Sequence, residues 1–201
     1  EAGLTAIDVP FYGPNATTHE AITATPGSFE RTLKGLQTLQ SRGVHGVAHV
    51  TLFEGNLPQL RETLEFLDGL GLEGIYTQIT GEVGLPGTYE AVAPSAATVA
   101  DALRAALDGL SLRTPLTISD VPVCVAGDLA PHLASSQTEP RRGAKAVVLP
   151  YSDWLATFSS GATRRFGRPC EACSGRDSCY GVSREVLRHF GDDWMQPRVA
   201  P

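Results

Sequence analysis

Residues 44–80 read VHGVAHVTLFEGNLPQLRETLEFLDGLGLEGIYTQIT, and they show the clearest strand–helix–strand pattern of the chain. Its two ends, residues 44–53 and 72–80, are rich in apolar and β-branched residues, which predicts two strands. Between them, a segment that opens at Pro58 and closes at Gly71 carries leucines three or four residues apart, which predicts a helix. A helix between two strands returns the chain to the same edge of a sheet, so we expect the two strands to be parallel.

The same alternation of strands and helices extends in both directions from this stretch. Upstream, the sequence predicts a strand over residues 3–11, a turn and loop, and a helix that is capped by Ser28 and ends at Gly43. Downstream, the predicted elements are a helix over 94–110, a strand over 115–121, a loop over 126–146, a short strand over 146–150 and a helix over 183–190. The pattern therefore indicates an α/β fold, either part of a barrel or an open sheet.

Composition narrows the class of protein. The chain has 201 residues, a net charge of −6 and 42% hydrophobic residues, so it can bury a core. The acidic balance argues against a nucleic-acid partner, because binding to phosphates needs a basic surface. No apolar run approaches the roughly 20 residues of a membrane span, and none opens the chain as a signal peptide would. We therefore expect no membrane association and a cytoplasmic location.

The beginning of the sequence is unusual. The chain starts with Glu1 rather than methionine, and the first predicted strand follows within a few residues. Three or four strands would leave an open edge that another segment has to cover. We therefore expect an additional N-terminal segment or a partner chain.

The four cysteines form the strongest motif. Cys170, Cys173 and Cys179 are clustered with C-x2-C and C-x5-C spacing, and Cys124 is the fourth. A C-x2-C pair can turn both thiolates toward one metal centre, and four thiolates suit a [4Fe–4S] cluster or tetrahedral zinc. Positive charge near thiolates lowers their pKa and offsets the charge of a cluster. The arginines close in sequence are Arg165, Arg168 and Arg176.

Two other interpretations of the cysteines stay open at this point. Two disulfides are disfavoured because no signal sequence indicates an oxidising compartment. Structural zinc is the stronger rival, although zinc ribbons usually present two C-x2-C pairs and only one is found here. The spacing alone does not decide between zinc and an iron–sulfur cluster.

Several short motifs in the first third of the chain resemble the middle of a radical SAM (S-adenosylmethionine) enzyme. Residues 12–15 (YGPN), 19–23 (HEAIT) and 26–29 (PGSF) look like the strand end, loop and helix start of that family. Residues 43–60 are similar to the strand, asparagine and helix that follow there.

The cysteine-rich tail resembles the auxiliary-cluster region of members with a SPASM- or Twitch-like extension. The matching motifs are P-x-C at residues 122–124 and C-x2-C-x5-C-x-G at residues 170–181. The resemblance implies that residues 1–122 form a partial parallel (β/α) barrel and that residues 123–201 form a short cysteine-rich extension. It also implies that Cys124, Cys170, Cys173 and Cys179 hold an auxiliary [4Fe–4S] cluster.

The sequence departs from the family at functionally important positions. The C-x3-C-x2-C loop, which binds the cluster that cleaves SAM, is absent, and so is the glycine-rich GGE stretch. Pro10 stands where many members have serine, and Ala24 stands for the motif glycine. These residues alone therefore cannot cleave SAM. SAM and a second [4Fe–4S] cluster are expected only with an additional N-terminal part.

The resemblance also implies a cavity lined by polar residues that follow or end the strands. The expected cofactor-binding residues are Tyr12, Thr51, Asn56 and Gln78, with Glu54 and Glu82 as further lining. Asn56 precedes Leu57-Pro58, so it is also a natural turn or cap residue. His19 is expected to brace a loop. His45 and His49 share one strand face, but no third metal ligand accompanies them.

The expected function is that of the C-terminal part of a radical SAM iron–sulfur enzyme. Its expected partners are a peptide or small-molecule substrate and an electron donor such as flavodoxin or ferredoxin. Because four protein thiolates leave no open iron, electron relay or structural support is the favoured role of the auxiliary cluster. The alternative is a non-catalytic iron–sulfur or zinc-binding module that pairs with another chain.

Overall fold

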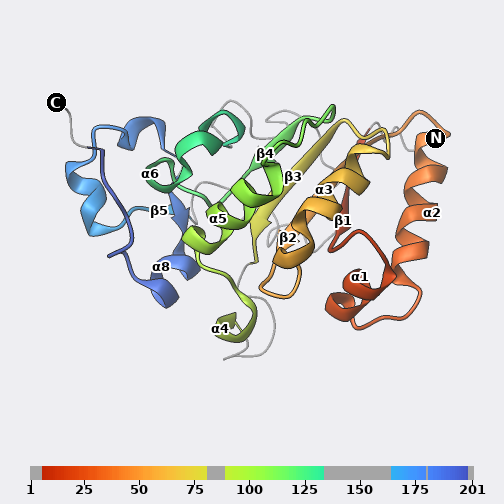
Figure 1. Cartoon of the computed structure of the whole chain (residues 1–201), viewed down its shortest axis with the longest axis horizontal. Coiled ribbons are helices and arrows are strands. Elements are labelled where there is room, and N and C mark those ends of the chain that lie inside the picture. The colour runs from red at the N-terminus through yellow and green to blue at the C-terminus, as the bar shows by residue number, and fades with distance from the viewer. Residues whose placement is uncertain (1–5, 81–88, 134–163, 180, 199–201) are drawn as a thin grey trace, which may run out of the picture.

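The computed structural model describes residues 6–80, 89–133, 164–179 and 181–198, and one parallel sheet forms its centre (Figure 1). The sheet contains β1 (Ala6–Phe11), β2 (His45–Leu52), β3 (Gly74–Ile79) and β4 (Leu116–Ile118). Its spatial order is β1-β2-β3-β4, and every neighbouring pair is parallel. The predicted α/β class and the parallel pairing are therefore confirmed.

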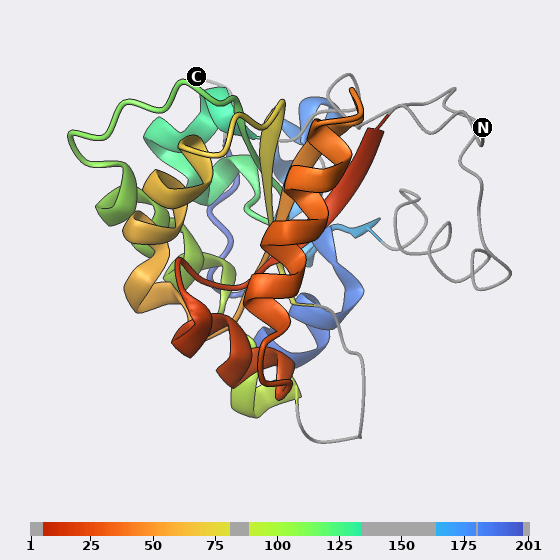
Figure 2. The same cartoon turned by 90° about the vertical axis from the view of Figure 1, so that its right-hand side faces the viewer.

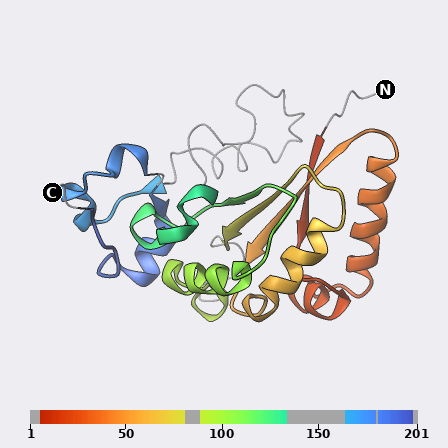
Figure 3. The same cartoon turned by 45° about the horizontal axis from the view of Figure 1, so that its top comes forward.

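Helices cover one face of this sheet. Figure 3 shows α2 (Ser28–Gln40), α3 (Leu60–Asp68) and α5 (Ala96–Leu107) on the same side of the strands. Alternate strand residues are buried on that side, as the period of two in a strand requires. The largest fully buried side chains of this core include Phe11, Leu36, Leu52, Leu64, Ile75 and Leu103.

The helix boundaries follow local chemistry that the sequence displays. Ser95 caps α5, because its side chain accepts a hydrogen bond from the Thr98 N–H at 3.1 Å. Gly43, with φ of 73°, terminates the turn after α2, a conformation that glycine adopts without steric cost. Ser28 is the first residue of α2 rather than its cap, which corrects the prediction by one position. Gly27 holds the capping position.

Three predictions of secondary structure were wrong. A helix, α1 (Ala16–Thr23), occupies the region expected to be a loop, and α4 (Tyr89–Val92) was not predicted. The expected loop begins with a 3₁₀ helix, η2 (Gly127–His132). Helix α1 buries only His19, so it has no apolar stripe that periodicity could detect. The short strand predicted over 146–150 lies outside the described residues.

A small C-terminal unit lies beyond β4, at the end of the sheet opposite β1 (Figures 1 and 3). Strand β5 (Arg164–Arg165) pairs antiparallel with β6 (Val182–Ser183). Two 3₁₀ turns, η4 (Arg168–Ala172) and η5 (Arg176–Ser178), lie between these strands in the sequence, and α8 (Arg184–Phe190) follows them. Ser183 caps α8 by accepting from the Val186 N–H at 3.3 Å, so the predicted terminal helix is confirmed.

The described strands do not close into a barrel. Strands β1 and β4 stand at the two edges of the four-stranded sheet, and the part of the chain that the structure describes adds no further strand to it. The predicted partial barrel is therefore confirmed only as a parallel α/β sheet. Within the same described ranges, no helix combines the length and apolar character needed to cross a membrane.

Helix α1 fits against the sheet through one buried histidine. His19 is 2% exposed, and its Nδ1 accepts from the Tyr12 N–H at 3.4 Å. Its ring lies 5.6 Å from that of Phe29 and 6.2 Å from that of Phe11 (Figure 2 shows α1 beside α2). This corresponds to the loop-bracing role expected from the sequence, although the braced segment is a helix.

Burial of His19 predicts a loss of stability in mild acid. Desolvation lowers the pKa of His19 below its usual 6.5, and the nearby Glu20 only partly opposes this effect. As the pH falls through about 6.5, the unfolded chain therefore binds the proton first and unfolding becomes easier. Below the pKa of the folded state this loss levels off.

Urea denaturation at pH 7.5 and 5.5 measures this effect. We expect the native protein to lose more stability between these pH values than His19→Asn, whose amide oxygen replaces the Nδ1 acceptor. Equal losses in both proteins would show that His19 does not contribute to the pH dependence.

Candidate functional site

Cys124 lies on a single helical turn directly after β4. This turn, α6 (Val123–Ala126), begins after Pro122, and the N–H groups of Val125 and Ala126 both donate to the Pro122 carbonyl. The sequence had extended the β4 segment toward this cysteine, but the strand itself ends at Ile118. Cys124 is half-buried and forms no disulfide.

The other three cysteines come from the C-terminal unit. Cys170 lies within η4, Cys173 follows its last residue, and Cys179 follows η5. All three are half-buried free thiols. Together with Cys124 they line one pocket, whose wall also contains Phe166, Gly181 and Met195. The structure thus brings together all four cysteines that the sequence had assigned to one site.

The four thiols line one pocket but do not form a compact group of metal ligands. Across the described ranges, no three side chains of His, Cys, Asp or Glu are grouped closely enough to hold a single metal ion. Tetrahedral zinc needs four sulfurs about 2.3 Å from one centre. An iron–sulfur cluster is larger, since each thiolate binds a different iron at the corner of the cluster. In its chemistry, a donor set of four thiols lining one pocket fits either a [4Fe–4S] cluster or tetrahedral zinc.

The thiols influence one another electrostatically. Burial raises the pKa of Cys124, a backbone hydrogen bond from Gln196 lowers it, and Cys179 and Cys170 raise it again. Burial likewise raises the pKa of Cys170, while a backbone hydrogen bond from Gly167 acts in the opposite direction. Thiols with raised pKa values hold their protons at neutral pH, so metal binding here would release protons.

Glycine is required where the chain closes the pocket. Gly181 has φ of 70°, and a Cβ at this position would lie 2.6 Å from the Arg165 carbonyl oxygen. Its N–H points to the Cys179 sulfur at 3.4 Å. Backbone hydrogen bonds to sulfur tune thiolate metal sites, so this glycine contributes both shape and polarity.

Gly181→Ala is therefore expected to destabilise the C-terminal unit by more than the roughly 1–3 kcal/mol that a non-glycine residue costs in a strained backbone conformation, because its Cβ also meets the Arg165 carbonyl oxygen. Thermal unfolding of the two proteins measures the difference. Gly43→Ala is the control, because Gly43 also has positive φ but nothing lies within 4 Å of its added Cβ. Equal effects of the two substitutions would show that the contact with Arg165 is unimportant.

The arginines expected near the thiols divide into two groups. Arg165 and Arg176 line the pocket, and the Arg176 guanidinium lies 5.1 Å from the centre of the Phe166 ring. Arg168 instead forms an ion pair with Asp192 at 3.1 Å, and this pairing holds the pKa of Asp192 below its ordinary value. The expectation that Arg168 offsets negative charge at the thiols is thus not supported, because its guanidinium is paired with Asp192.

The expected cofactor-binding residues lie elsewhere, along the sheet. Thr51 and Gln78 are register partners on β2 and β3. They project from the sheet face opposite to the buried residues Val50 and Ile79. Tyr12 follows β1, is half-buried, and has its pKa raised by burial. These three residues belong to the end of the sheet where the strands terminate, which is where ligands bind in parallel α/β folds.

The Asn56 side chain forms three hydrogen bonds, all with backbone groups. Its side-chain oxygen accepts from the Phe53 N–H at 2.9 Å, and its amide nitrogen donates to the carbonyls of Thr51 at 2.9 Å and Tyr12 at 3.1 Å. The residue is 3% exposed. Its turn-forming role is therefore present in the structure, whereas a contact with a cofactor stays a prediction. Glu54 is exposed, and Glu82 lies outside the described residues.

The same sheet face also carries His49, for which the sequence indicated no role beyond sharing a strand face with His45. His49 pairs in register with Tyr76, and their rings meet edge to face at 5.1 Å. Asp8 and Gln78 raise the pKa of His49, but burial lowers it more strongly. Among the described residues, no hydrogen-bond partner reaches its buried Nε2, so this atom could bond a ligand. His45, the other histidine of the strand, instead pairs with Glu73 at 2.5 Å.

Two buried polar residues that follow β4 were not predicted from the sequence as site residues. Ser119 is 2% and Asp120 is 6% exposed, and Asp120 has φ of 66°, in the left-handed region. Strained residues at strand ends are frequent in functional sites. The Ser-Asp pair directly after an apolar strand was the available signal.

Comparison with known proteins gives limited matches to this chain. No protein-family model matches it. Over 71 residues, 35% of its length, it is 30% identical to a protein of Oleidesulfovibrio alaskensis named AdoMet-dependent heme synthase. Over 70 residues it is 34% identical to a protein of the same name from Methanosarcina barkeri. The matched regions span 18% and 20% of these relatives, so the chain covers about a fifth of their length.

Proposed function

We propose that this chain is the later part of a radical SAM iron–sulfur enzyme, and that Cys124, Cys170, Cys173 and Cys179 hold an auxiliary [4Fe–4S] cluster. The observation that carries the proposal is the single pocket lined by four free thiols from distant parts of the chain. The two partial relatives add support, because both are named for a reaction that depends on AdoMet, another name for SAM.

The topology supports the assignment of residues 1–122 to part of a barrel. In a doubly wound sheet the strand order reverses and helices cover both faces. Here the order follows the chain and α2, α3 and α5 lie on one side, as in an arc of a (β/α) barrel. Residues 123–201 then form the extension that carries the cluster. The polar sheet face with Thr51, His49 and Gln78 would line the interior of the barrel.

Each part of the chain has its own task in this proposal. The auxiliary cluster supplies one-electron transfer or structural support when bound, because four protein thiolates leave no iron open to a substrate. Tyr12, Thr51, Asn56 and Gln78 contribute to the cavity for SAM and substrate. An upstream part supplies the second cluster and the site of SAM cleavage. Flavodoxin or ferredoxin is the proposed electron donor, and the protein is proposed to act in the cytoplasm.

The substrate is proposed to be a small molecule rather than a peptide. The names of the relatives refer to heme synthesis, which favours a heme precursor as the first compound to test. The second candidate function is a non-catalytic metal module that pairs with another chain. It is favoured by the absence of a C-x3-C-x2-C loop from the 201 residues.

The decisive experiment uses the native protein that contains this chain, isolated without oxygen and incubated with SAM and dithionite. We expect 5′-deoxyadenosine to form, whereas residues 1–201 alone are expected to form none. Cys170→Ser in the native protein should still cleave SAM but fail to convert substrate. Absence of 5′-deoxyadenosine from a native protein with full iron content would refute the enzymatic proposal and favour the non-catalytic module.

A further inference from the structure

The helical turn that carries Cys124 is too short to hold its own position. Helix α6 has four residues, and isolated helices of that length are not stable in water. Pro122 precedes it without a side-chain cap, and Gly127, with φ of 56°, ends it. Contacts with the rest of the protein therefore have to fix the place of Cys124 relative to the other three thiols.

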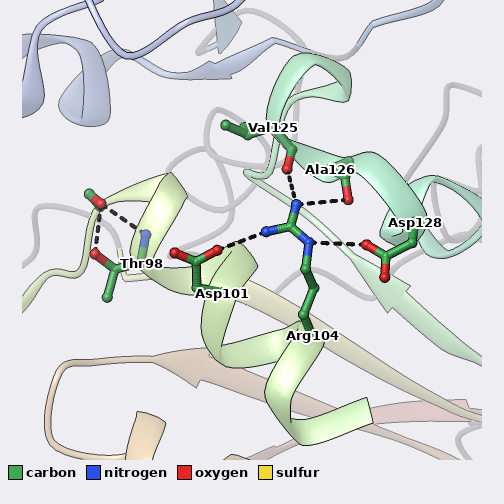
Figure 4. Close-up of polar contacts among 7 residues, drawn as sticks. Thr98, Asp101, Arg104, Val125, Ala126 and Asp128 are labelled. Atoms are coloured by element: carbon green, nitrogen blue, oxygen red, sulfur yellow. Dashed lines mark hydrogen bonds and ion pairs between the residues drawn. The ribbon is translucent and has the colours of Figure 1, made fainter. Parts of the chain in front are cut away.

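Arg104 of α5 provides such a contact through all three nitrogens of its guanidinium (Figure 4). Its Nη2 donates to the carbonyl oxygens of Val125 and Ala126, the latter at 3.2 Å. Its Nε donates to Asp128 at 3.0 Å, and its Nη1 donates to Asp101 at 2.8 Å. We call these contacts the Arg104 network.

The chemistry of the Arg104 network suits a helix end. The last carbonyls of a helix lack intrahelical partners and carry partial negative charge, so a cation there is stabilising. Asp101 and Asp128 hold the planar guanidinium in one orientation, and the side chain is 34% exposed. Around Arg104, α5 is anchored in the core by Val99 and Leu103, both 0% exposed. The network therefore joins the short α6 to a rigid helix.

We propose that Arg104 is a positioning residue for the metal centre. By binding the carbonyls of Val125 and Ala126, it fixes the turn on which Cys124 stands and thereby determines how firmly the four-cysteine pocket retains its metal. The part of this inference that concerns metal retention rests on the proposed function. The positioning of the Cys124 thiol itself is testable in the metal-free protein.

The test compares Arg104→Met with the matched control Arg61→Met. Arg61 also caps a helix end: its Nη1 donates to the carbonyls of Ala106 at 3.3 Å and Asp108 at 2.7 Å. Those carbonyls belong to the end of α5, not to α6. Both substitutions remove a guanidinium that binds two backbone carbonyls at a helix end, but only Arg104→Met frees the turn that carries Cys124. Arg104→Lys keeps the charge without the planar fork and should fall between the native protein and Arg104→Met.

The first readout is the alkylation rate of each cysteine in the metal-free protein, followed by peptide mass spectrometry. In Arg104→Met we expect Cys124 to react at least roughly tenfold faster, the effect on local opening of losing even one of the two charged hydrogen bonds to the α6 carbonyls. The rates of Cys170, Cys173 and Cys179 should stay unchanged. The second readout is the rate of iron loss to a chelator, which should rise in Arg104→Met and not in Arg61→Met.

The outcomes separate the two proposals. Unchanged Cys124 alkylation in Arg104→Met, or equal effects of both substitutions, would overturn the role of Arg104 whatever metal the protein holds. If Cys124 is alkylated faster in Arg104→Met but the native protein binds no iron, the positioning role is supported and the cluster is refuted. Faster alkylation together with faster iron loss supports both.

Discussion

Cys124→Ser is expected to lose most of the iron and acid-labile sulfide that the native chain binds. A serine oxygen is a harder and weaker ligand for iron than a thiolate, so one corner of the cluster would be left without its ligand. Loss of one iron exposes the remaining cluster to solvent and to degradation. Cys170→Ser, in the C-terminal unit, is expected to act in the same way because it lines the same pocket.

The matched control is Glu171→Gln, an exposed position between Cys170 and Cys173 in the same turn. It removes a charge beside the site without removing a thiol, and it should keep the native iron content. Iron and sulfide are counted per chain after anaerobic purification. If Cys124→Ser retains the full content while Cys170→Ser loses it, Cys124 is not a ligand and the four-thiolate site is wrong.

Asn56→Ala is expected to destabilise the fold by about 3 kcal/mol. The substitution removes three part-buried hydrogen bonds and leaves backbone groups of Phe53, Thr51 and Tyr12 without these partners, at about 1 kcal/mol each. For a chain of this length that lowers the Tm by about 6–12 °C. The substitution would loosen the chain after β1 and β2, because Asn56 bonds the carbonyls of both Tyr12 and Thr51.

Asn15→Ala serves as the control for thermal unfolding. Asn15 caps α1 and accepts one backbone hydrogen bond at 3.1 Å, so its loss should cost about 1 kcal/mol. Asn56→Asp keeps the acceptor for Phe53 but loses both donors, and it should fall near Asn56→Ala. A Tm for Asn56→Ala as high as that of Asn15→Ala would refute the structural role. Weaker SAM binding at native stability would instead support a cofactor contact.

The main elements were predictable because their residues repeat at the period of the structure. Leucines at helical spacing from residue 60 and alternating apolar residues from residue 45 are signals that one segment carries by itself. Helix α1 was not predicted, because its only buried residue is His19 and it has no apolar stripe. Its signal was the N-cap Asn15, which is chemistry at one position rather than a pattern.

The site was predictable only where its residues form a motif. The spacing of Cys170, Cys173 and Cys179 identifies a thiol cluster, because these side chains share one short stretch of chain. Arg104 belongs to no sequence motif, and His49 shows only that it shares a strand face with His45. The setting of His49 depends on the register with Tyr76, and that of Arg104 depends on packing of α5 against α6, which are decided by tertiary structure.

The four-cysteine site is tested by the content of iron, acid-labile sulfide and zinc in residues 1–201 after strictly anaerobic purification. We expect about four irons and four sulfides per chain and no zinc, since four thiolates hold one [4Fe–4S] cluster. One zinc per chain without sulfide would contradict this expectation, and the C-terminal unit would then be a structural zinc site on an α/β domain.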